Sequence, residues 1–240
     1  MPQSKKPTQK RLKKEPYTVI SLGGSIIVPD AIDTKFLRAF RDLIRDHIKQ
    51  GRRFVIISGG GKTARRYMSA AETLTALASE DIDWLGIHST RLNGHLIRTL
   101  FRKEACPTII KDPRRKITAT HPVIVAAGWK PGRSTDYVAT CIAKNLGAKK
   151  LINLSNVDFA YDKDPREHKD AKPIKTSSWK DFRALLPKKW DPGLSAPFDP
   201  IAAREAEKLG LEVAIINGRK LKEVGKYLAG EPFKGTIVTD

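Results

Sequence analysis

The chain has 240 residues, of which 40% are hydrophobic and 30% charged, and its formal net charge is +19. No apolar run approaches the roughly 20 residues of a membrane-spanning helix, and no apolar segment of a secretory signal follows the basic start. Cys106 and Cys141 are too few for a disulfide framework. We therefore expect a cytoplasmic protein with buried thiols and no membrane contact.

Residues 1–16 hold six Lys or Arg and one Glu, and we expect a disordered basic tail followed by a single domain over 17–240. The basic charge favours anionic ligands and weak, salt-sensitive contact with nucleic acid. Aromatic residues make up only 7% and form no stacking ladder. We expect no specific nucleic-acid partner.

Beyond the tail, short apolar runs alternate with longer amphipathic stretches. The apolar runs predict strands over 17–22, 53–58, 107–111, 121–128, 150–155, 211–218 and 235–239. The amphipathic stretches predict helices over 33–51, 63–78, 81–106, 135–147, 178–186, 199–210 and 221–230, and a loop-rich stretch over 156–175. Asp33 is suited to cap the first helix and Gly51 to end it. This alternation predicts a mostly parallel sheet with helices on both faces.

Four strands end in unusual loops. These loops are Gly23–Ser25, Gly59–Lys62, 126–136 and 154–165. In sheets of this kind, ligands bind beyond the carboxyl ends of the strands. We therefore expect all four loops to converge on one crevice.

The segment VIISGGGKTARRY, 55–67, matches only the end of a P-loop, because the first glycine of that pattern would fall at Ile56. Ile56 lies in an apolar run that predicts a buried strand. A glycine turn after a strand nevertheless lets backbone N–H groups face an anion without a Cβ in the way. Two such turns, together with Lys62 and Arg65, predict a phosphate site.

The loop GWKPGRST, 128–135, combines glycines, cations and hydroxyls and predicts a third anion site for a second substrate. Ser134 and Thr135 are equally typical of a helix N-cap, and Trp129 fits either a lid or packing. The Asp-rich loop around Tyr161 could hold a purine base with a ribose or metal, or have no function. No nucleophile, redox or zinc pattern accompanies these loops. Direct phosphoryl transfer is therefore favoured, with Lys62 and Arg65 neutralising charge and Mg²⁺ bridging the donor phosphates.

The ordered motifs LGGS, SGGGKTARRY, DWLGIHSTRLN, GWKPGRSTD, LSNVDFAYDKDP and APFDPIAA resemble the amino acid kinase superfamily and, within it, the archaeal type of UMP kinase. The resemblance extends from Tyr17 to Thr239. It implies a three-layer α/β/α sandwich around a mostly parallel sheet, ATP as donor, UMP as acceptor, Mg²⁺ and a homohexamer. It also implies a role in pyrimidine nucleotide biosynthesis.

The resemblance also assigns roles to individual residues. It implies ATP binding by Gly24, Ser25, Gly61, Arg65, Ser155, Asn156, Tyr161 and Asp164. It implies UMP binding by Gly60, Asp83, Trp129, Lys130, Pro131, Gly132, Arg133, Ser134 and Thr135. Asp199 would lie near the transfer centre, so that Lys62, Arg65 and Asp199 form the expected catalytic set; no metal ligand is assigned.

Three departures from the family pattern bear on function. Ser21 stands where many relatives have Lys, which shifts charge stabilisation toward Lys62. Trp129, Lys130 and Arg133 replace two histidines and a threonine of the acceptor loop, and Phe159 replaces a glycine. Two alternatives stay open: a kinase of another small phosphate, such as isopentenyl phosphate, or a non-catalytic binder of nucleotides or oxyanions.

Overall fold

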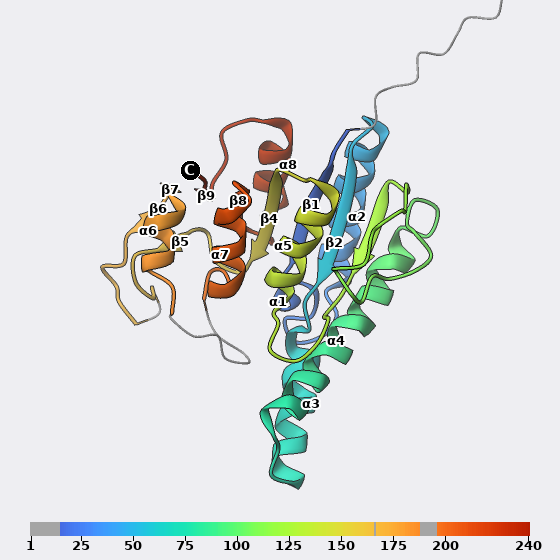
Figure 1. Ribbon diagram of the computed structural model, residues 1–240, viewed down its shortest axis with the longest axis vertical. Helices are drawn as coiled ribbons and strands as arrows, with labels where there is room; N and C mark the ends of the chain where they lie inside the picture. The colour runs from blue at the N-terminus through green and yellow to red at the C-terminus, as the bar shows by residue number, and fades with distance from the viewer. Residues whose placement is uncertain (1–14, 166, 188–195) are drawn as a thin grey trace, which may run out of the picture.

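The computed structural model describes residues 15–165, 167–187 and 196–240 (Figure 1). Nearly all of the predicted basic tail lies outside these residues. Within the described chain, seven strands form one sheet in the order β3-β2-β1-β4-β8-β9-β7. The strands are β1 (Tyr17–Leu22), β2 (Arg53–Ser58), β3 (Val123–Ala126), β4 (Lys150–Ser155), β7 (Thr176–Ser177), β8 (Glu212–Asn217) and β9 (Thr236–Val238). Two further short strands, β5 (Ala160–Tyr161) and β6 (Pro173–Ile174), form a separate antiparallel pair.

The first five strands of this order are all parallel to one another, and β9 runs antiparallel to β8. The helices are α1 (Gly24–Ile27), α2 (Thr34–Lys49), α3 (Gly61–Leu74), α4 (Ser79–Leu100), α5 (Thr135–Leu146), α6 (Trp179–Ala184), α7 (Pro200–Lys208) and α8 (Leu221–Ala229). The carboxyl ends of β3, β2, β1 and β4 therefore share one edge of the sheet. This is the edge at which the four loops were predicted to meet.

Alternate residues of each strand point into two separate cores. Ile20 and Ile56 pack with α2, α8 and the last turns of α4 on one face. Val19 and Val55 pack with α5, α6 and α7 on the other face. Figure 1 shows α5 and α7 in front of the sheet and α2 behind it. The predicted three-layer α/β/α sandwich around a mostly parallel sheet is confirmed.

Helix ends follow the local sequence signals. The Asp33 carboxylate accepts a hydrogen bond of 2.9 Å from the amide of Phe36, which caps α2 as predicted. Gly51 follows the end of α2 with a positive φ of 89°. Ser134 caps α5 by accepting from the amide of Tyr137 at 3.1 Å. Ile56 is fully buried in β2, as its place in the apolar run predicted.

One predicted strand does not form, and one predicted helix is shorter than expected. No strand forms over 107–111; Ile110 makes only an isolated bridge to Ala126 at the sheet edge. The segment begins with Pro107 and is followed by Pro113, and proline has no backbone N–H to donate to a strand ladder. The predicted helix over 81–106 ends at Leu100, because Phe101 leaves helical geometry to enter the core, where it is fully buried.

Both cysteines are free thiols and only partly buried, so the prediction of buried thiols was too strong. None of the helices in the described part of the chain combines the length and apolar character needed to cross a membrane.

Candidate active site

The turns after β1 and β2 touch through their backbones. A Cβ on Gly24 would overlap the amide nitrogen of Gly61 and lie only 2.7 Å from that of Gly60. A Cβ on Gly59 would lie 2.9 Å from the Cα of Gly24. No side chain fits between these turns, so glycine is required at this contact. The contact places the starts of α1 and α3 side by side.

No side chain caps the start of α3, where Gly60 is the N-cap and Gly61 has a φ of 63°. The Lys62 amide donates to the Val28 carbonyl at 2.9 Å, and the other N–H groups of the first turn, together with the helix dipole, can face an anion. Lys62 is half-buried and Arg65 exposed, and neither side chain forms an ion pair with the described residues. Two uncommitted cations therefore flank the predicted phosphate turn.

The predicted acceptor loop, Trp129–Thr135, follows β3. Its Gly132 amide donates a hydrogen bond of 2.7 Å to the carboxylate of Asp83 on α4. The structure thus brings together two parts of the predicted UMP site that are far apart in sequence. The other carboxylate oxygen, Oδ1, accepts no hydrogen bond from the described residues.

Aromatic and cationic side chains stack along this loop. The Trp129 ring lies parallel to that of Tyr137, with centroids 6.4 Å apart. The Arg114 guanidinium lies 4.3 Å from the centroid of Trp129, and that of Arg133 lies 4.9 Å from the centroid of Tyr137. Lys130 also approaches the Trp129 ring, at 4.7 Å. Trp129 is therefore packed against the core beside these cations rather than free to act as a lid.

Asp136 and Asp199 meet near the carboxyl end of β1, and only Asp199 was among the predicted site residues. Ser21 Oγ donates to Asp136 Oδ1 at 2.9 Å, and the Asp199 amide donates to Asp136 Oδ2 at 3.3 Å. Asp199 Oδ1 caps α7 by accepting from Ala202 at 2.6 Å. Asp199 Oδ2 is buried and has no hydrogen-bond partner among the described residues.

Asp136 was missed because it reads as an acidic residue in the first turn of a helix, directly after the Ser134 cap. Burial of its carboxyl group raises the pKa of Asp136 to about 6, and the nearby charge of Asp199 adds to this, whereas the hydrogen bond from Ser21 opposes it. A lysine at position 21 would compensate that buried charge; the Ser21 hydroxyl supplies only a neutral donor.

The predicted adenosine end lies at the carboxyl ends of β4 and β8. Asp158 accepts hydrogen bonds from Asn217 and Lys220 and pairs with Lys234 at 2.7 Å. The two lysine ammonium groups hold the pKa of Asp158 well below its usual range. Asp158 is thereby committed to joining the loops after β4 and β8.

Beside this cluster, the Phe159 and Tyr161 rings meet edge to face at 6.5 Å, and Lys234 lies 5.7 Å from the Phe159 centroid. Asn156 is exposed and Tyr161 half-buried, so both can be reached by a ligand. The Phe159 side chain, at a position where the resemblance predicts glycine, is accommodated in this contact without a positive φ.

The four loops form a row in the order of their strands. The acceptor loop follows β3, the glycine turns follow β2 and β1, and Ser155, Asn156, Tyr161 and Asp164 lie on or after β4. The Gly23 amide donates to the Leu154 carbonyl at 3.0 Å, which joins the β1 turn to β4. The predicted donor and acceptor loops therefore lie on opposite sides of the predicted phosphate turns.

The chain is similar to known proteins over nearly its whole length. A profile of the amino acid kinase family matches residues 16–217. A uridylate kinase of Methanospirillum hungatei is 33% identical over 93% of this chain and 95% of its own length. A uridylate kinase of Hyperthermus butylicus is 31% identical over 92% of this chain and 97% of its own length.

Among solved structures, the uridylate kinase of Archaeoglobus fulgidus superposes with a TM-score of 0.79 at 27% identity, covering 92% of this chain and 99% of that protein. The UMP kinase of Bacillus anthracis superposes with a TM-score of 0.74 at 18% identity, over 94% of this chain and 96% of that protein. At that identity the second comparison concerns the fold alone.

Proposed function

This chain belongs to the amino acid kinase family, and we propose that it is a UMP kinase that transfers the γ-phosphoryl group of ATP to UMP, forming UDP and ADP. The observation that carries the proposal is the backbone contact of Gly24 with Gly61, flanked by the uncommitted cations Lys62 and Arg65. Donor-side and acceptor-side loops border this contact. The nearly full-length similarity to uridylate kinases supports the same substrates.

Each part of the row has a distinct task in the proposed reaction. The glycine turns bind the transferring phosphates through backbone N–H groups, and Lys62 and Arg65 neutralise charge that develops on the phosphoryl oxygens. Asp83 and the acceptor loop orient UMP, with the free oxygen of Asp83 available to the ribose. Ser155, Asn156, Tyr161 and Asp164 hold the adenosine end. No covalent intermediate is needed, because positioning and charge neutralisation suffice.

The site fits Mg²⁺ bound together with the donor phosphates. No cluster of three or more potential ligands occurs among the described residues, but Mg²⁺ at nucleotide sites usually takes only one or two carboxylates. Asp199 would hold it, since its buried Oδ2 has no partner in the part of the chain that the structure describes. The ion would neutralise charge on the donor phosphates.

We extend the proposal to a homohexamer that acts in the cytoplasm in pyrimidine nucleotide biosynthesis. These points are supported by the resemblance to the family. The structure is that of one chain, so size measurement in solution is the direct test of assembly.

The activity is tested by measuring ADP release from ATP and Mg²⁺ with UMP, CMP, isopentenyl phosphate or no acceptor. Turnover confined to UMP is expected. Turnover with another acceptor would instead favour a sister kinase, in line with the replacement of the acceptor-loop histidines by Trp129, Lys130 and Arg133. Nucleotide binding without turnover would favour a non-catalytic binder, in line with Ser21.

A further inference from the structure

One stretch of α4 is bonded to both the glycine turn and the acceptor loop. The side-chain amide of Asn93 donates to the carbonyls of Gly59 and Gly60, at 2.8 and 3.1 Å. Asn93 is only 3% exposed, so these bonds are not exchanged with water. This residue therefore fixes the backbone of the predicted phosphate turn.

The acceptor loop is held by the two neighbouring positions, Thr90 and Arg91. Thr90 Oγ1 accepts from the Gly128 amide at 2.8 Å. The Arg91 guanidinium donates to the carbonyls of Gly128 and Trp129, at 3.3 and 3.0 Å. Gly128 is thus held through both its amide and its carbonyl, at the point where the acceptor loop leaves β3.

The helix itself is packed too closely against the strand ends to slide. A Cβ on Gly128 would lie 3.3 Å from the Cα of Ile87, and one on Gly94 would lie 3.0 Å from Ser58 Oγ. Ser58 Oγ also donates to the Thr90 carbonyl at 2.9 Å. The contact residues of α4 recur at helical spacing, so they share the face that meets β2 and β3.

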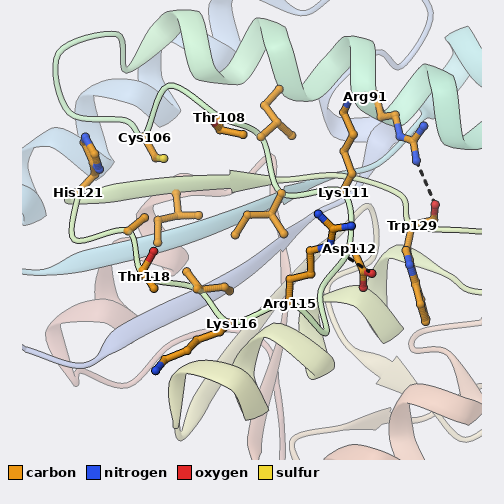
Figure 2. Close-up of a pocket in the computed structure, with 15 residues that line it drawn as sticks. Arg91, Cys106, Thr108, Lys111, Asp112, Arg115, Lys116, Thr118, His121 and Trp129 are labelled. Atoms are coloured by element: carbon orange, nitrogen blue, oxygen red, sulfur yellow. Dashed lines mark hydrogen bonds and ion pairs between the residues drawn. The ribbon is translucent and has the colours of Figure 1, made fainter.

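Arg91 does not face the predicted phosphates. Its side chain lines a pocket of about 790 Å³ beside β3, together with Lys111, Ile124 and Trp129. Figure 2 shows the guanidinium reaching from this pocket to the Trp129 carbonyl, with Cys106 and His121 at the far end. No carboxylate pairs with Arg91 among the described residues, and burial lowers its pKa. Its hydrogen bonds are made to backbone carbonyls.

We infer that Asn93 and Arg91 are positioning residues that set the distance between the phosphate turn and the acceptor loop. This inference rests on the proposed function, in which one loop binds the donor phosphates and the other the acceptor. The two loops follow different strands, and α4 is the rigid element bonded to both. Phosphoryl transfer depends on that distance, since misplacement by about 1 Å can lower a rate by two orders of magnitude.

The inference predicts separate kinetic effects. Asn93→Ala should lower turnover about ten-fold or more and raise the KM for both ATP and UMP, because the turn that it holds carries Gly61 of the predicted ATP site and Gly60 of the predicted UMP site. Arg91→Ala should raise the KM for UMP about ten-fold, with a small change for ATP. Leu92→Ala is the matched control, because Leu92 lies between them on α4 and is 63% exposed.

A conservative variant separates positioning from charge. Arg91→Lys keeps the positive charge but not the planar, two-pronged donor. If Arg91 positions the loop through its two carbonyl bonds, Arg91→Lys should keep most of the defect of Arg91→Ala. Full rescue by lysine would overturn this role.

Hydrogen exchange tests the inference without requiring catalysis. Asn93→Ala should speed amide exchange in residues 59–62 and leave 128–133 unchanged, and Arg91→Ala should do the reverse. Uniform changes in both loops, or none, would overturn the inference. Absence of UMP turnover in the unaltered chain would refute the proposed substrate, and the exchange pattern would still decide whether α4 positions the two loops.

Discussion

Ser21 and Asp136, 115 residues apart in the sequence, are joined by a hydrogen bond of 2.9 Å between the hydroxyl of β1 and the carboxylate of α5. Ser21 is only 2% exposed. Ser21 is the position at which the resemblance to the family predicts a lysine, and here its hydroxyl is the side-chain donor to Asp136. The serine at position 21 therefore bears on the stability of the site through its hydrogen bond to the Asp136 carboxylate.

Ser21→Ala should lower the free energy of unfolding by about 1–3 kcal/mol at neutral pH, because it leaves a buried carboxylate oxygen without its donor. Denaturant titration measures this loss. Ser89→Ala is the matched control: Ser89 is also buried, but its hydroxyl donates only to the Leu85 carbonyl of its own helix. Equal losses of unfolding free energy in the two variants would show that the bond to Asp136 contributes no more than an ordinary hydroxyl hydrogen bond within a helix.

Gly24→Ala tests the contact between the glycine turns. The added methyl would overlap the backbone of Gly61, so we expect a loss of about 1–3 kcal/mol in stability and loss of ATP binding. Isothermal titration with ATP and Mg²⁺ checks the binding. Gly225→Ala is the control, since Gly225 lies inside α8 and a Cβ there would meet only Leu43 Cδ1 of α2, at 3.5 Å. This variant should raise the free energy of unfolding by up to about 1 kcal/mol.

Local signals predicted the framework of the fold. The largely apolar runs of β1, β2 and β4 correspond to strands covered on both faces, and Asp33 and Ser134 mark the starts of α2 and α5. These features depend on neighbouring residues, which the sequence displays directly. The glycine turns after β1 and β2 followed in the same way, and that they bind phosphate stays a prediction.

Contacts between distant residues could not be predicted from these signals. The pairing of Asp136 with Asp199 joins the starts of two helices, and no local pattern marks it. The residues of α4 that hold the loops belong to the motif DWLGIHSTRLN, but their partners are backbone groups of the loops after β2 and β3. The end of α4 at Leu100 depends on Phe101 entering the core, whereas the local sequence favours a longer helix.

Arg65→Ala should lower turnover by roughly two to three orders of magnitude if Arg65 stabilises the transferring phosphoryl group. Steady-state kinetics at saturating ATP and UMP measure the effect. Arg66→Ala is the neighbouring control, because Arg66 is committed to an exposed ion pair with Asp30 at 2.9 Å. Its loss should leave turnover unchanged. A rate for Arg65→Ala equal to that of the control would remove Arg65 from the mechanism.

Asp158→Asn should change how stability depends on pH. The lysines hold the pKa of Asp158 below its ordinary value of 3.8, so the unfolded chain takes up a proton at this carboxylate before the folded chain does. The stabilisation from the cluster is therefore complete above about pH 5 and is lost as the pH falls through the range below 4. The variant lacks this component at every pH.

At pH 7 we expect the variant to be less stable by roughly 1 kcal/mol, since Lys220 and Lys234 are nearly half exposed and the pairs are screened by solvent. The difference should shrink steadily between about pH 5 and pH 2 in denaturant titrations. Asp170→Asn, which breaks the more exposed pair with Lys163, should show a smaller difference at pH 7. A difference for Asp158→Asn that stays constant with pH would mean that the carboxylate charge does not stabilise this junction.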